Sequence, residues 1–568
     1  MNRRTGICAV AVSGVAALFA LSACQTPAAS GIASEAAQEV APVQKLPEAR
    51  FTAAEFADRM KTLASDEFAG RAPGSIGETK TIDYLIAQAK SIGLQPGING
   101  SFVQNVPMIE SETDLSTKLV LNTPAGKRTL SFSKDMVIGT TTGKPLVTLK
   151  DSDVVFVGYG VNAPELGWND YAGLDVKGKT VVILVNDPGF QIKDENLFEG
   201  RRMTYYGRWT YKFEEAARQG ASAAFIVHDN EGAAYGWSVV DNGWTGKQFD
   251  LTPADDPAPR LPIRGWLTQE AASQLFADAG LRLTDQYTSA SRKGFKAIPL
   301  KSKASASLKT SIAMKSSQNF VAKLPGTKRP DEAIIYQAHW DHLGTNDGSA
   351  GEDHIYNGAV DNASGVAAIM TIAQGFMRAS VKPERSLIFF APTLEESGLL
   401  GSKYFVAHPA VPLKNTVAVI NIDAMAMLGK ARNLVIIGNG MSDLEDTLKP
   451  YAAIQGRALA PENTPQDGFY FRSDHFNFAK AGVPALYIKG GDDLIDGGIA
   501  RGREMLEDYR LNHYHKTSDE FDPKWNLEGA IQDLQVLYAV GHELAFSEKW
   551  PLWYPTSAFR GAQDALRK

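Results

Sequence analysis

The chain has 568 residues, of which 44% are hydrophobic and 21% charged, and its formal net charge at pH 7 is −6. These values are ordinary for a globular protein, and the length allows several domains of about 150 residues each. The mild acidic excess argues against nucleic acid as a partner, because nucleic-acid binding needs concentrated Lys and Arg.

The first residues predict export. Two arginines precede an apolar run, residues 7–20, which is short for a membrane span of about 20 residues and typical of a secretory signal. Residues 21–24, Leu-Ser-Ala-Cys, resemble the bacterial lipobox, which implies cleavage before Cys24 and lipidation of its thiol. The alternative is a plain signal peptide followed by a chance cysteine. Gln25 resembles the residue that follows the cysteine in lipoproteins sent to the outer membrane.

The expected mature protein is therefore a periplasmic lipoprotein whose lipid is its only membrane attachment. Removal of the signal, residues 1–23, takes away Cys8 and two positive charges, so the net charge changes from −6 to −8. Cys24 is the remaining cysteine, and its lipidation leaves no thiol for a disulfide. Residues 24–50 are rich in Ala, Pro, Ser, Glu and Gln, which predicts a disordered tether.

The predicted folded part begins at residue 51 and is interrupted by a long insert. Residues 51–65 and 77–94 carry apolar residues at helical spacing, and we assign these helices to packing. Residues 114–315, called the insert below, consist of short apolar runs broken by Gly, Pro and Asp. The insert resembles the protease-associated (PA) domain, a β-rich unit found beside the active site of several peptidase families. The alternative is an unrelated β-rich spacer.

Beyond residue 316, strand-like runs alternate with helical ones. They lie at 332–338, 366–378, 386–391, 399–407, 416–422, 442–453, 484–488 and 527–546. The alternation predicts an α/β fold with a mostly parallel, mixed sheet and helices on both faces. We assign residues 51–113 and 316–548 to one domain, called the α/β region below, and residues 549–568 to a C-terminal tail.

Polar residues follow three of the predicted strands. His339, the Glu395-Glu396 pair and Asp423 each come after an apolar run, directly or within a few residues. The carboxyl ends of neighbouring strands form the ligand-binding rim of such sheets, so these side chains are expected to meet. Asp361 precedes a predicted helix, where a capping role would explain it equally well.

The ensemble of these residues decides between the alternatives. Taken singly, a His near an Asp is usually a surface pair, and adjacent Glu residues are usually exposed. Two His and three or four carboxylates, however, suit a pair of divalent ions about 3.5–4 Å apart with one carboxylate bridging. Zinc fits His and carboxylate ligands best, although manganese and cobalt also use them. Such a site makes a bound water more acidic and stabilises an oxyanion.

Five motifs, in order, resemble those of the co-catalytic, two-zinc metallopeptidases. The family includes bacterial leucyl and vacuolar aminopeptidases and glutamate carboxypeptidase. The motifs are HWDHLG from residue 339, GAVDNASG from 358, LEESGLLGS from 394, NIDAM from 421 and YHKTSDE from 514. The NIDAM motif departs from the family pattern at one point. It has Asp-Ala-Met where the family often has Asp-Met, and the carboxylate is unchanged.

The resemblance implies a metal-binding role for five residues. His339 and Asp423 would bind one ion, Glu396 and His515 would bind the other, and Asp361 would bridge the two. The peptide bond that follows the bridging residue is usually cis in this family.

The resemblance also implies three residues for the chemistry. Glu395 matches the general base, and Asp341 matches the carboxylate that orients the first histidine ligand. Tyr514 matches a tyrosine that in some members donates a hydrogen bond to the tetrahedral intermediate. His515 is favoured over His513 as the ligand, because the family ligand follows a Tyr and precedes an acid by four residues.

Three further residues near the motifs have no assigned chemistry. His342 and His354 match no ligand position, and a surface or loop role is expected for both. Arg472 is equally compatible with binding a free carboxylate and with a plain surface position.

The resemblance therefore implies an exported metal-dependent exopeptidase that acts on peptides. The leading interpretation is an aminopeptidase that hydrolyses N-terminal peptide bonds with a metal-activated water. A carboxypeptidase or a glutaminyl cyclase of the same fold is the alternative, and a non-catalytic, receptor-like protein is the third reading. Substrate side chain and oligomeric state are not legible in the sequence.

Overall fold

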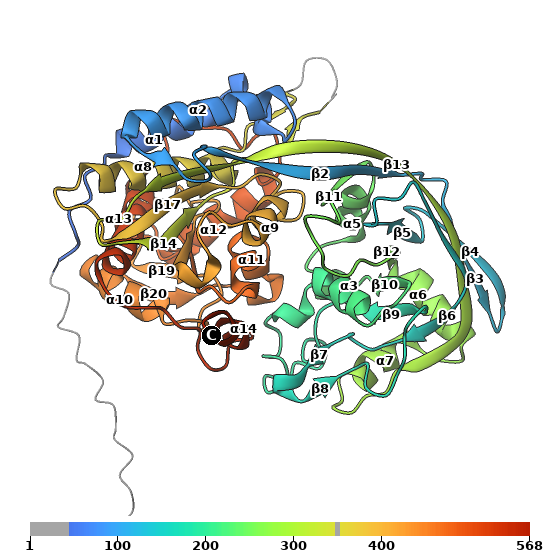
Figure 1. Ribbon diagram of the computed structural model, residues 1–568. Coiled ribbons are helices and arrows are strands. Elements are labelled where there is room, and N and C mark those ends of the chain that lie inside the picture. Colours follow the sequence, from blue (N-terminus) through green and yellow to red (C-terminus); the bar gives the residue numbers. More distant parts are fainter. Residues whose placement is uncertain (1–44, 347–352) are drawn as a thin grey trace, which may run out of the picture. The chain divides into compact units, whose positions relative to one another are not determined.

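The computed structural model describes residues 45–346 and 353–568 (Figure 1). The predicted signal segment, Cys24 and most of the predicted tether lie outside the described residues. Leu46 and Ala49, which were assigned to the tether, pack against the hydrophobic core of the α/β region, so the folded chain begins earlier than predicted. Within the described ranges no helix has the length and hydropathy needed to cross a membrane.

A mixed sheet forms the centre of the α/β region. Parallel pairings join its middle strands in the order β17 (Arg385–Ala391), β14 (Arg329–Gln337), β18 (Thr416–Asn421) and β21 (Ala485–Lys489). Beyond β17, antiparallel pairings add β13 (Ile298–Leu324) and β2 (Val103–Thr113), with β1 (Gln95–Pro96) on β13 and β11 (Lys247–Leu251) on β2. Beyond β21 come antiparallel β19 (Asn433–Ile436) and then β20 (Ala458–Pro461), parallel to β19. The predicted α/β class with a mostly parallel centre is confirmed.

Helices pack on both faces of this sheet. Successive side chains of a strand point to opposite faces, so Ile334 and Tyr336 of β14 enter one core and Ile335 enters another. The first core includes α1 (Ala53–Leu63), α2 (Ile76–Ile92), α8 (Ser364–Arg378), α10 (Leu444–Ile454) and α13 (Glu528–Phe546). The second includes α9 (Leu400–Ala407), α11 (His475–Lys480) and the end of α14 (Arg560–Leu566). A further helix, α12 (Gly498–Asn512), precedes the last predicted ligand.

Local signals set several of the helix ends. Thr52 and Glu55 form a reciprocal capping box at the start of α1. Gly93, the predicted stop, follows α2 in the left-handed conformation with φ of 93°. These two helices lie close to their predicted ranges because their capping residues and apolar spacing agree.

The insert has its own hydrophobic core. Its sheet runs in the order β4 (Gly126–Ser131), β3 (Lys118–Thr123), β13, β6 (Leu146–Phe156), β9 (Thr180–Leu184), β10 (Ala223–Val227), β12 (Ile263–Leu267) and β5 (Met136–Gly139). Its helices are α3 (Trp209–Arg218), α4 (Asn230–Ala233), α5 (Trp237–Trp244), α6 (Gln269–Asp278) and α7 (Leu283–Ala290). The insert thus contains helices as well as strands, and its resemblance to a PA domain stays a prediction.

One long strand belongs to both sheets. Residues 298–309 of β13 pair with β6, residues 310–320 pair with β2, and residues 320–324 pair with β17. Two short pairs complete the strands: β7 (Asn162–Ala163) with β8 (Trp168–Asn169), and β15 (Gly344–Thr345) with β16 (Ile355–Tyr356). The backbone is therefore continuous in β structure across the predicted boundary at residue 315.

The predicted C-terminal tail is part of the fold. Trp553 is fully buried, its backbone N–H donates to Gln563 Oε1 at 3.0 Å, and its ring lies 5.2 Å from that of Phe559. The backbone N–H of Leu552 donates to Asp443 Oδ1 at 2.9 Å, at the start of α10. Residues 549–568 therefore hold their position through packing and hydrogen bonds.

The close contact of α13 with β14 predicts that Gly541, on α13, cannot be replaced by a larger residue without a loss of stability. A Cβ added at Gly541 would lie 1.7 Å from the hydroxyl oxygen of Tyr336, a buried group that donates to Leu537 O at 2.9 Å. We expect Gly541→Ala to lower the free energy of unfolding by about 1–3 kcal/mol, as overpacking does. Gly561→Ala in α14 is the control, because nothing lies within 4 Å of its Cβ position. Urea unfolding followed by circular dichroism measures both, and equal stabilities would contradict the packing of α13 on β14.

Candidate metal centre

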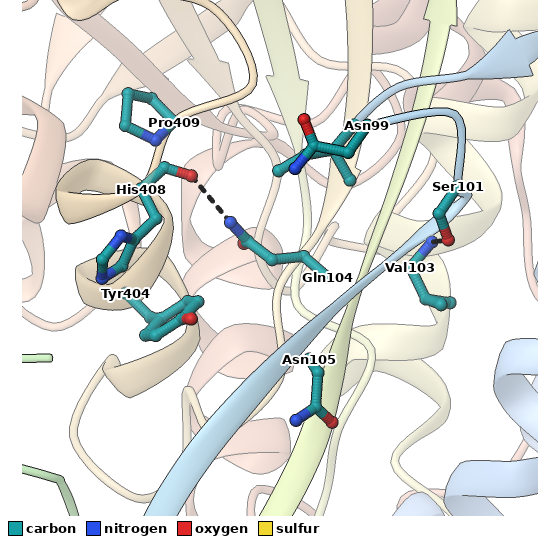
Figure 2. Close-up of a pocket in the computed structure, with 9 residues that line it drawn as sticks. Asn99, Ser101, Val103, Gln104, Asn105, Tyr404, His408 and Pro409 are labelled. Atoms are coloured by element: carbon teal, nitrogen blue, oxygen red, sulfur yellow. Dashed lines mark hydrogen bonds between the residues drawn. The ribbon is translucent and has the colours of Figure 1, made fainter.

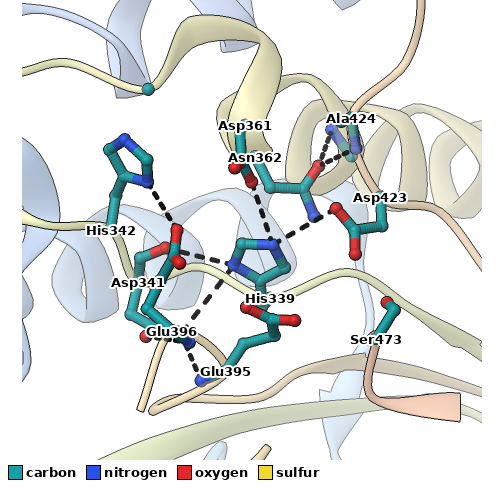
Figure 3. Close-up of polar contacts among 12 residues, drawn as sticks. His339, Asp341, His342, Asp361, Asn362, Glu395, Glu396, Asp423, Ala424 and Ser473 are labelled. Carbon is teal, nitrogen blue, oxygen red and sulfur yellow. Dashed lines mark hydrogen bonds and ion pairs between the residues drawn. The ribbon is translucent and has the colours of Figure 1, made fainter. Parts of the chain in front are cut away.

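The carboxyl ends of three neighbouring strands bring the predicted site residues together (Figure 3). His339 follows β14, the Glu395-Glu396 pair follows β17, and Asp423 follows β18. Each strand ends in a run of buried, mostly apolar residues, and the predicted site residues stand where the chain leaves the sheet. The rim expected from the sequence is present in the structure.

The carboxylate of Asp361 lies between two imidazoles. Its Oδ1 is 3.2 Å from His339 Nε2, and its Oδ2 is 3.2 Å from His515 Nε2. His339 Nε2 is also 3.4 Å from Asp423 Oδ1, and His515 Nε2 is 3.1 Å from Glu396 Oε2. The five predicted metal ligands therefore form two groups that share one carboxylate, which is the division that the resemblance implied.

His342 differs from its expected surface or loop role. It is 1% exposed, and its Nδ1 lies 2.8 Å from Glu396 Oε1. Together with Asp361 and Glu396 it forms a group whose ligand atoms all lie within 4.8 Å of one another. The sequence offered one signal, the three-residue spacing from His339. His354 is half-buried, and its carbonyl accepts from the backbone N–H of Asn346.

Asp341 holds the segment that carries the two glutamates. Its Oδ1 accepts from the backbone N–H of Glu395 at 3.1 Å and its Oδ2 from that of Glu396 at 3.4 Å. Its carbonyl oxygen lies 3.1 Å from His339 Nδ1, closer than its Oδ1 at 3.9 Å. Asp341 thus contacts both the predicted ligand and the predicted base. Among the described residues, no hydrogen bond is made to the Glu395 carboxylate, which leaves its oxygens available to a reactant.

The segment after α12 points His515 toward the centre and His513 away from it. His513 is directed at Ser518 O, 2.9 Å from its Nδ1, and at Asp508, 3.7 Å from its Nε2. The ring of Tyr514 stacks on that of His515 at 4.0 Å, and the Tyr514 residue as a whole is 40% exposed. Tyr514 therefore lies directly beside the predicted ligand His515.

Two buried side chains fix the turn that carries Asp361. Asp519 accepts from the backbone N–H of Val360 at 3.0 Å and from that of Asp361 at 3.1 Å. The Oδ1 of Asn362 accepts from Gly365 N and from Ala424 N, which ties this turn to the residue after Asp423. The peptide bond between Asp361 and Asn362 is cis, as the resemblance implied. The sequence indicated the four-residue spacing of Asp519 from His515, but it did not predict that Asp519 accepts hydrogen bonds from the turn that carries Asp361.

Arg71 is a structural residue that the sequence analysis missed. It is 1% exposed and donates to four backbone oxygens, those of Leu63 at 2.8 Å, Trp340 at 3.0 Å, Asn357 at 2.6 Å and Gly358 at 2.9 Å. Burial lowers the pKa of its guanidinium to about 10, against the attraction of nearby carboxylates. It joins the loop after α1 to two of the segments that carry ligands, those of His339 and Asp361. No local pattern marks such a role in a Gly/Pro loop.

Asp474 and His475 are two further buried residues beside the cluster. They are 1% and 0% exposed. Burial raises the pKa of Asp474 to about 7, an effect that the charge of His339 opposes. Burial lowers the pKa of His475 to about 3. An Asp-His pair at the start of a short helix gave no sequence signal beyond its place near the last strand.

The electrostatics of the cluster call for a cation. Burial disfavours charge on His339 and His515, yet the surrounding carboxylates raise the pKa of the first well above its usual value and that of the second to about 11. Burial also favours a protonated Glu396, but His515 and neighbouring groups hold its pKa at about 2. The pKa of Glu395 is raised well above its usual value by burial and by the charges of Glu396 and Asp423. Carboxylates outnumber the imidazoles that could balance them.

The donor set fits divalent metal ions. Nε2 of His515 is buried and lies within 3.2 Å of two carboxylate oxygens without forming a hydrogen bond to either. Imidazole nitrogens and carboxylate oxygens on both sides of one shared carboxylate are the ligands expected for a pair of zinc ions. His339, Asp361, Asp423, Glu396 and His515 would hold them.

A cavity of about 490 Å³ lies elsewhere, beside the start of β2 and the end of α9 (Figure 2). Gln104, Asn105, Tyr404 and His408 are among its lining residues, and Gln104 Nε2 donates to His408 O at 2.7 Å. None of the predicted site residues lines it. The cavity is therefore separate from the cluster.

Comparison with known proteins agrees with the residues at the cluster. Residues 319–539 match the sequence profile of Peptidase family M28, and the matched segment contains every predicted metal ligand. Over these residues the chain is similar to peptidase family M28. The M28 match begins within β13 and therefore leaves out the insert and the first two helices.

Relatives of the M28 region cover limited parts of the chain. Leupeptin-inactivating enzyme 1 of Streptomyces exfoliatus is 32% identical over 176 residues, 31% of this chain and 36% of that protein. A "Probable zinc metalloprotease" of Pyrenophora tritici-repentis is 35% identical over 112 residues, 20% of this chain and 24% of that protein. The chain thus spans about a third or less of the length of these curated relatives.

Among solved structures, an aminopeptidase from Aneurinibacillus sp. strain AM-1 is similar over most of the chain. The comparison covers 88% of this chain and 96% of that one, with 21% sequence identity and a TM-score of 0.48.

The hydrogen bonds of Arg71 predict that this residue, although far in sequence from the metal ligands, stabilises the fold around them. Arg71→Met would leave four carbonyl oxygens without their donor, so we expect the free energy of unfolding to fall by about 3 kcal/mol or more. Arg510→Met is the control, because Arg510 is exposed and pairs with Glu507 on its own helix, and exposed pairs of this kind contribute little to stability. Chemical denaturation measures the free energy of unfolding of both variants. Equal loss would contradict the buried network.

Proposed function

We propose that the chain is a zinc-dependent exopeptidase, an aminopeptidase that releases residues from the N-terminus of peptides. The observation that carries the proposal is the shared Asp361 carboxylate. Its two oxygens each lie 3.2 Å from a different imidazole, that of His339 or that of His515. Each imidazole also lies 3.1–3.4 Å from a second carboxylate, Asp423 or Glu396. The similarity of the matched segment to peptidase family M28 supports the proposal. The name of the zinc metalloprotease relative supports zinc as the metal.

The chemistry is hydrolysis of a peptide bond. Bound zinc ions would polarise a carbonyl oxygen and make a water molecule more acidic. In our proposal Glu395 accepts a proton from the attacking water as the new carbon–oxygen bond forms. It then gives that proton to the leaving amine as the carbon–nitrogen bond breaks. The absence of hydrogen bonds to its carboxylate from described residues leaves it free for both transfers.

Two neighbours assist this exchange. Asp341 accepts hydrogen bonds from the backbone of Glu395 and of Glu396, which holds the base and the ligand in fixed relation. Tyr514 lies against His515 and can donate its hydroxyl hydrogen to the oxyanion that develops on the substrate. The chain therefore supplies a proton carrier, a support for it and an oxyanion donor.

The aminopeptidase reading is tested by the choice of blocked and free substrates. Zinc-loaded protein should cleave aminoacyl p-nitroanilides and free peptides from their N-termini, and N-acetylated versions should be poor substrates. Cleavage of N-acetylated peptides from the C-terminus would favour the carboxypeptidase alternative. Cyclisation of N-terminal glutamine without hydrolysis would favour the cyclase. Binding of peptides without turnover would favour the receptor-like reading.

Metal content provides the first prediction from the proposed function. We expect about two zinc ions per chain after purification without chelator, because two donor groups share Asp361. Elemental analysis measures the ratio. Dialysis against a chelator should remove the metal together with activity, and added zinc should restore both. Asp361→Asn is the informative variant, because loss of the shared carboxylate should weaken binding at both positions. A ratio near zero that no added metal raises would contradict the centre.

The adjacent glutamates provide the second prediction, because they are proposed to act differently. Glu395→Gln should keep its zinc and lower kcat by about 10²–10⁴, with little change in KM, as loss of a general base does. Glu396→Gln should lose affinity for the ion that it shares with His515, so its activity should partly return at high zinc concentration.

Each variant is the control for the other, since both remove one carboxylate from the same segment. The measurements are steady-state kinetics over a range of zinc concentrations and metal analysis of the purified variants. If Glu395→Gln loses metal while Glu396→Gln retains it, the two roles are exchanged. Full activity in both variants would remove this pair from the mechanism.

A further inference from the structure

A short strand of the insert packs near the segment that carries the two glutamates. β11 pairs with β2 and lies next to α9, the helix that begins a few residues after Glu396 (Figure 1). The last residue of β11, Leu251, is fully buried and belongs to a small hydrophobic cluster that is separate from the three larger cores. The other buried members of this cluster are Val106, Met108, Leu394 and Leu400. The insert therefore meets the segment after β17 through apolar packing.

The glutamate loop, residues 394–400, begins and ends in this cluster. The backbone N–H of Leu400 donates to the carbonyl oxygen of Leu394 at 3.0 Å, which closes the loop at its base. Both glutamates lie between these two leucines, and both leucine side chains are buried. Because the two ends of the loop pack in the cluster that contains Leu251, a change in the cluster would displace the loop as a whole.

The backbone of Leu394 has a conformation that needs support. Its φ is 57°, in the left-handed region that residues with a side chain rarely adopt unless the surrounding structure holds them there. Polar contacts fix the residue before it, since Thr393 N donates to Asn319 Oδ1 at 3.0 Å and Thr393 Oγ1 lies 2.6 Å from Ser317 Oγ. The side chain of Leu394 is held by the apolar cluster instead.

The end of β11 is fastened on both sides. Arg260 donates from Nη2 to the carbonyl oxygen of Leu251 at 2.9 Å, and its Nη1 lies 3.2 Å from Asp250 Oδ2. Five residues beyond Leu251, Asp256 Oδ2 accepts from Lys403 Nζ of α9 at 2.5 Å. An ion pair and apolar packing thus join the same stretch of the insert to α9. Leu251 is therefore held against the base of the glutamate loop.

We propose that Leu251 is a positioning residue for the reaction. Together with Met108 it supports Leu394 and Leu400, so that Glu395 is held where it can exchange a proton with the attacking water. The inference rests on the proposed function for the role of Glu395. A displacement of about 1 Å in a reacting group costs about 10²-fold in rate, so apolar support of this kind has a measurable consequence.

Kinetics of two substitutions at one position test the support. Leu251→Ala removes most of the side chain, and at saturating zinc its kcat should fall about 10- to 100-fold while KM changes by less than about twofold. Leu251→Met keeps the volume of the side chain and should retain at least about half of the wild-type kcat. Elemental analysis should give the same zinc content for all three proteins under these conditions, which excludes an empty centre as the cause.

A matched control separates positioning from loss of stability. Leu267, on β12, is 1% exposed and belongs to the core of the insert, not to the cluster of Leu251. Leu267→Ala and Leu251→Ala both leave a cavity and should both lower the unfolding temperature. Leu267→Ala should nevertheless keep its kcat within about twofold of wild type, because it is distant from the loop. If Leu251→Ala does not fold, Leu251→Val gives the same comparison with a smaller cavity and a fall in kcat of about threefold or more.

Two kinetic results would overturn the inference. One is a wild-type kcat in a folded Leu251 variant that has a lowered unfolding temperature. The other is an equal fall in kcat for Leu251→Ala and Leu267→Ala, because that result would make the effect one of general destabilisation.

Hydrogen exchange keeps the inference testable if no peptide is hydrolysed. The amides of Leu400 and Gly401 donate to the carbonyl oxygens of Leu394 and Thr393, so their exchange rates report how often the base of the loop opens. Mass spectrometry should show exchange about 10-fold faster in Leu251→Ala and unchanged in Leu267→Ala. That result without turnover by the wild-type protein would refute the peptidase function and leave the support of the loop standing. Unchanged exchange in Leu251→Ala would overturn the support itself.

Discussion

The carboxylate of Asp361 lies between two imidazoles, and much of the surrounding chain keeps it there. Asp519 accepts from the backbone on its N-terminal side, and Asn362 ties its C-terminal side to the segment that carries Asp423. Arg71 binds the carbonyl oxygen of Gly358 at the start of the same turn. A carboxylate placed by loops alone would be mobile. Here the loops are cross-linked by buried hydrogen bonds, which are costly to break because the groups have no water to replace them.

The same cluster shows why a cation belongs to this fold. Buried carboxylates repel one another; their charges raise the pKa of His339 and His515, and burial together with neighbouring carboxylates raises that of Glu395. Divalent ions would provide a larger positive charge at the same place and would favour the deprotonated form of each ligand. Metal binding and protonation are therefore coupled in this protein, as they are at metal sites generally.

The insert and the α/β region have separate cores, but one strand passes through both sheets. That continuity limits how far the insert can move without disturbing β13 where it pairs with β17, next to the strands that carry the ligands. The insert is therefore positioned to act on the centre through fixed contacts.

The sequence by itself determined the α/β class, the alternation of strands and helices beyond residue 316, and the residues at the strand ends. Long apolar runs and helical periodicity are local, and His339, Glu395, Glu396 and Asp423 stand next to those runs. The choice of His515 over His513 also rested on local spacing, and the structure directs only His515 at the cluster. Only the tertiary structure showed the residues whose contacts lie far away in the sequence. His342 is buried against Glu396, and Arg71 binds loops about 270 to 290 residues away. Such contacts leave no local pattern, because each residue is chosen for a partner that only the folded chain brings near.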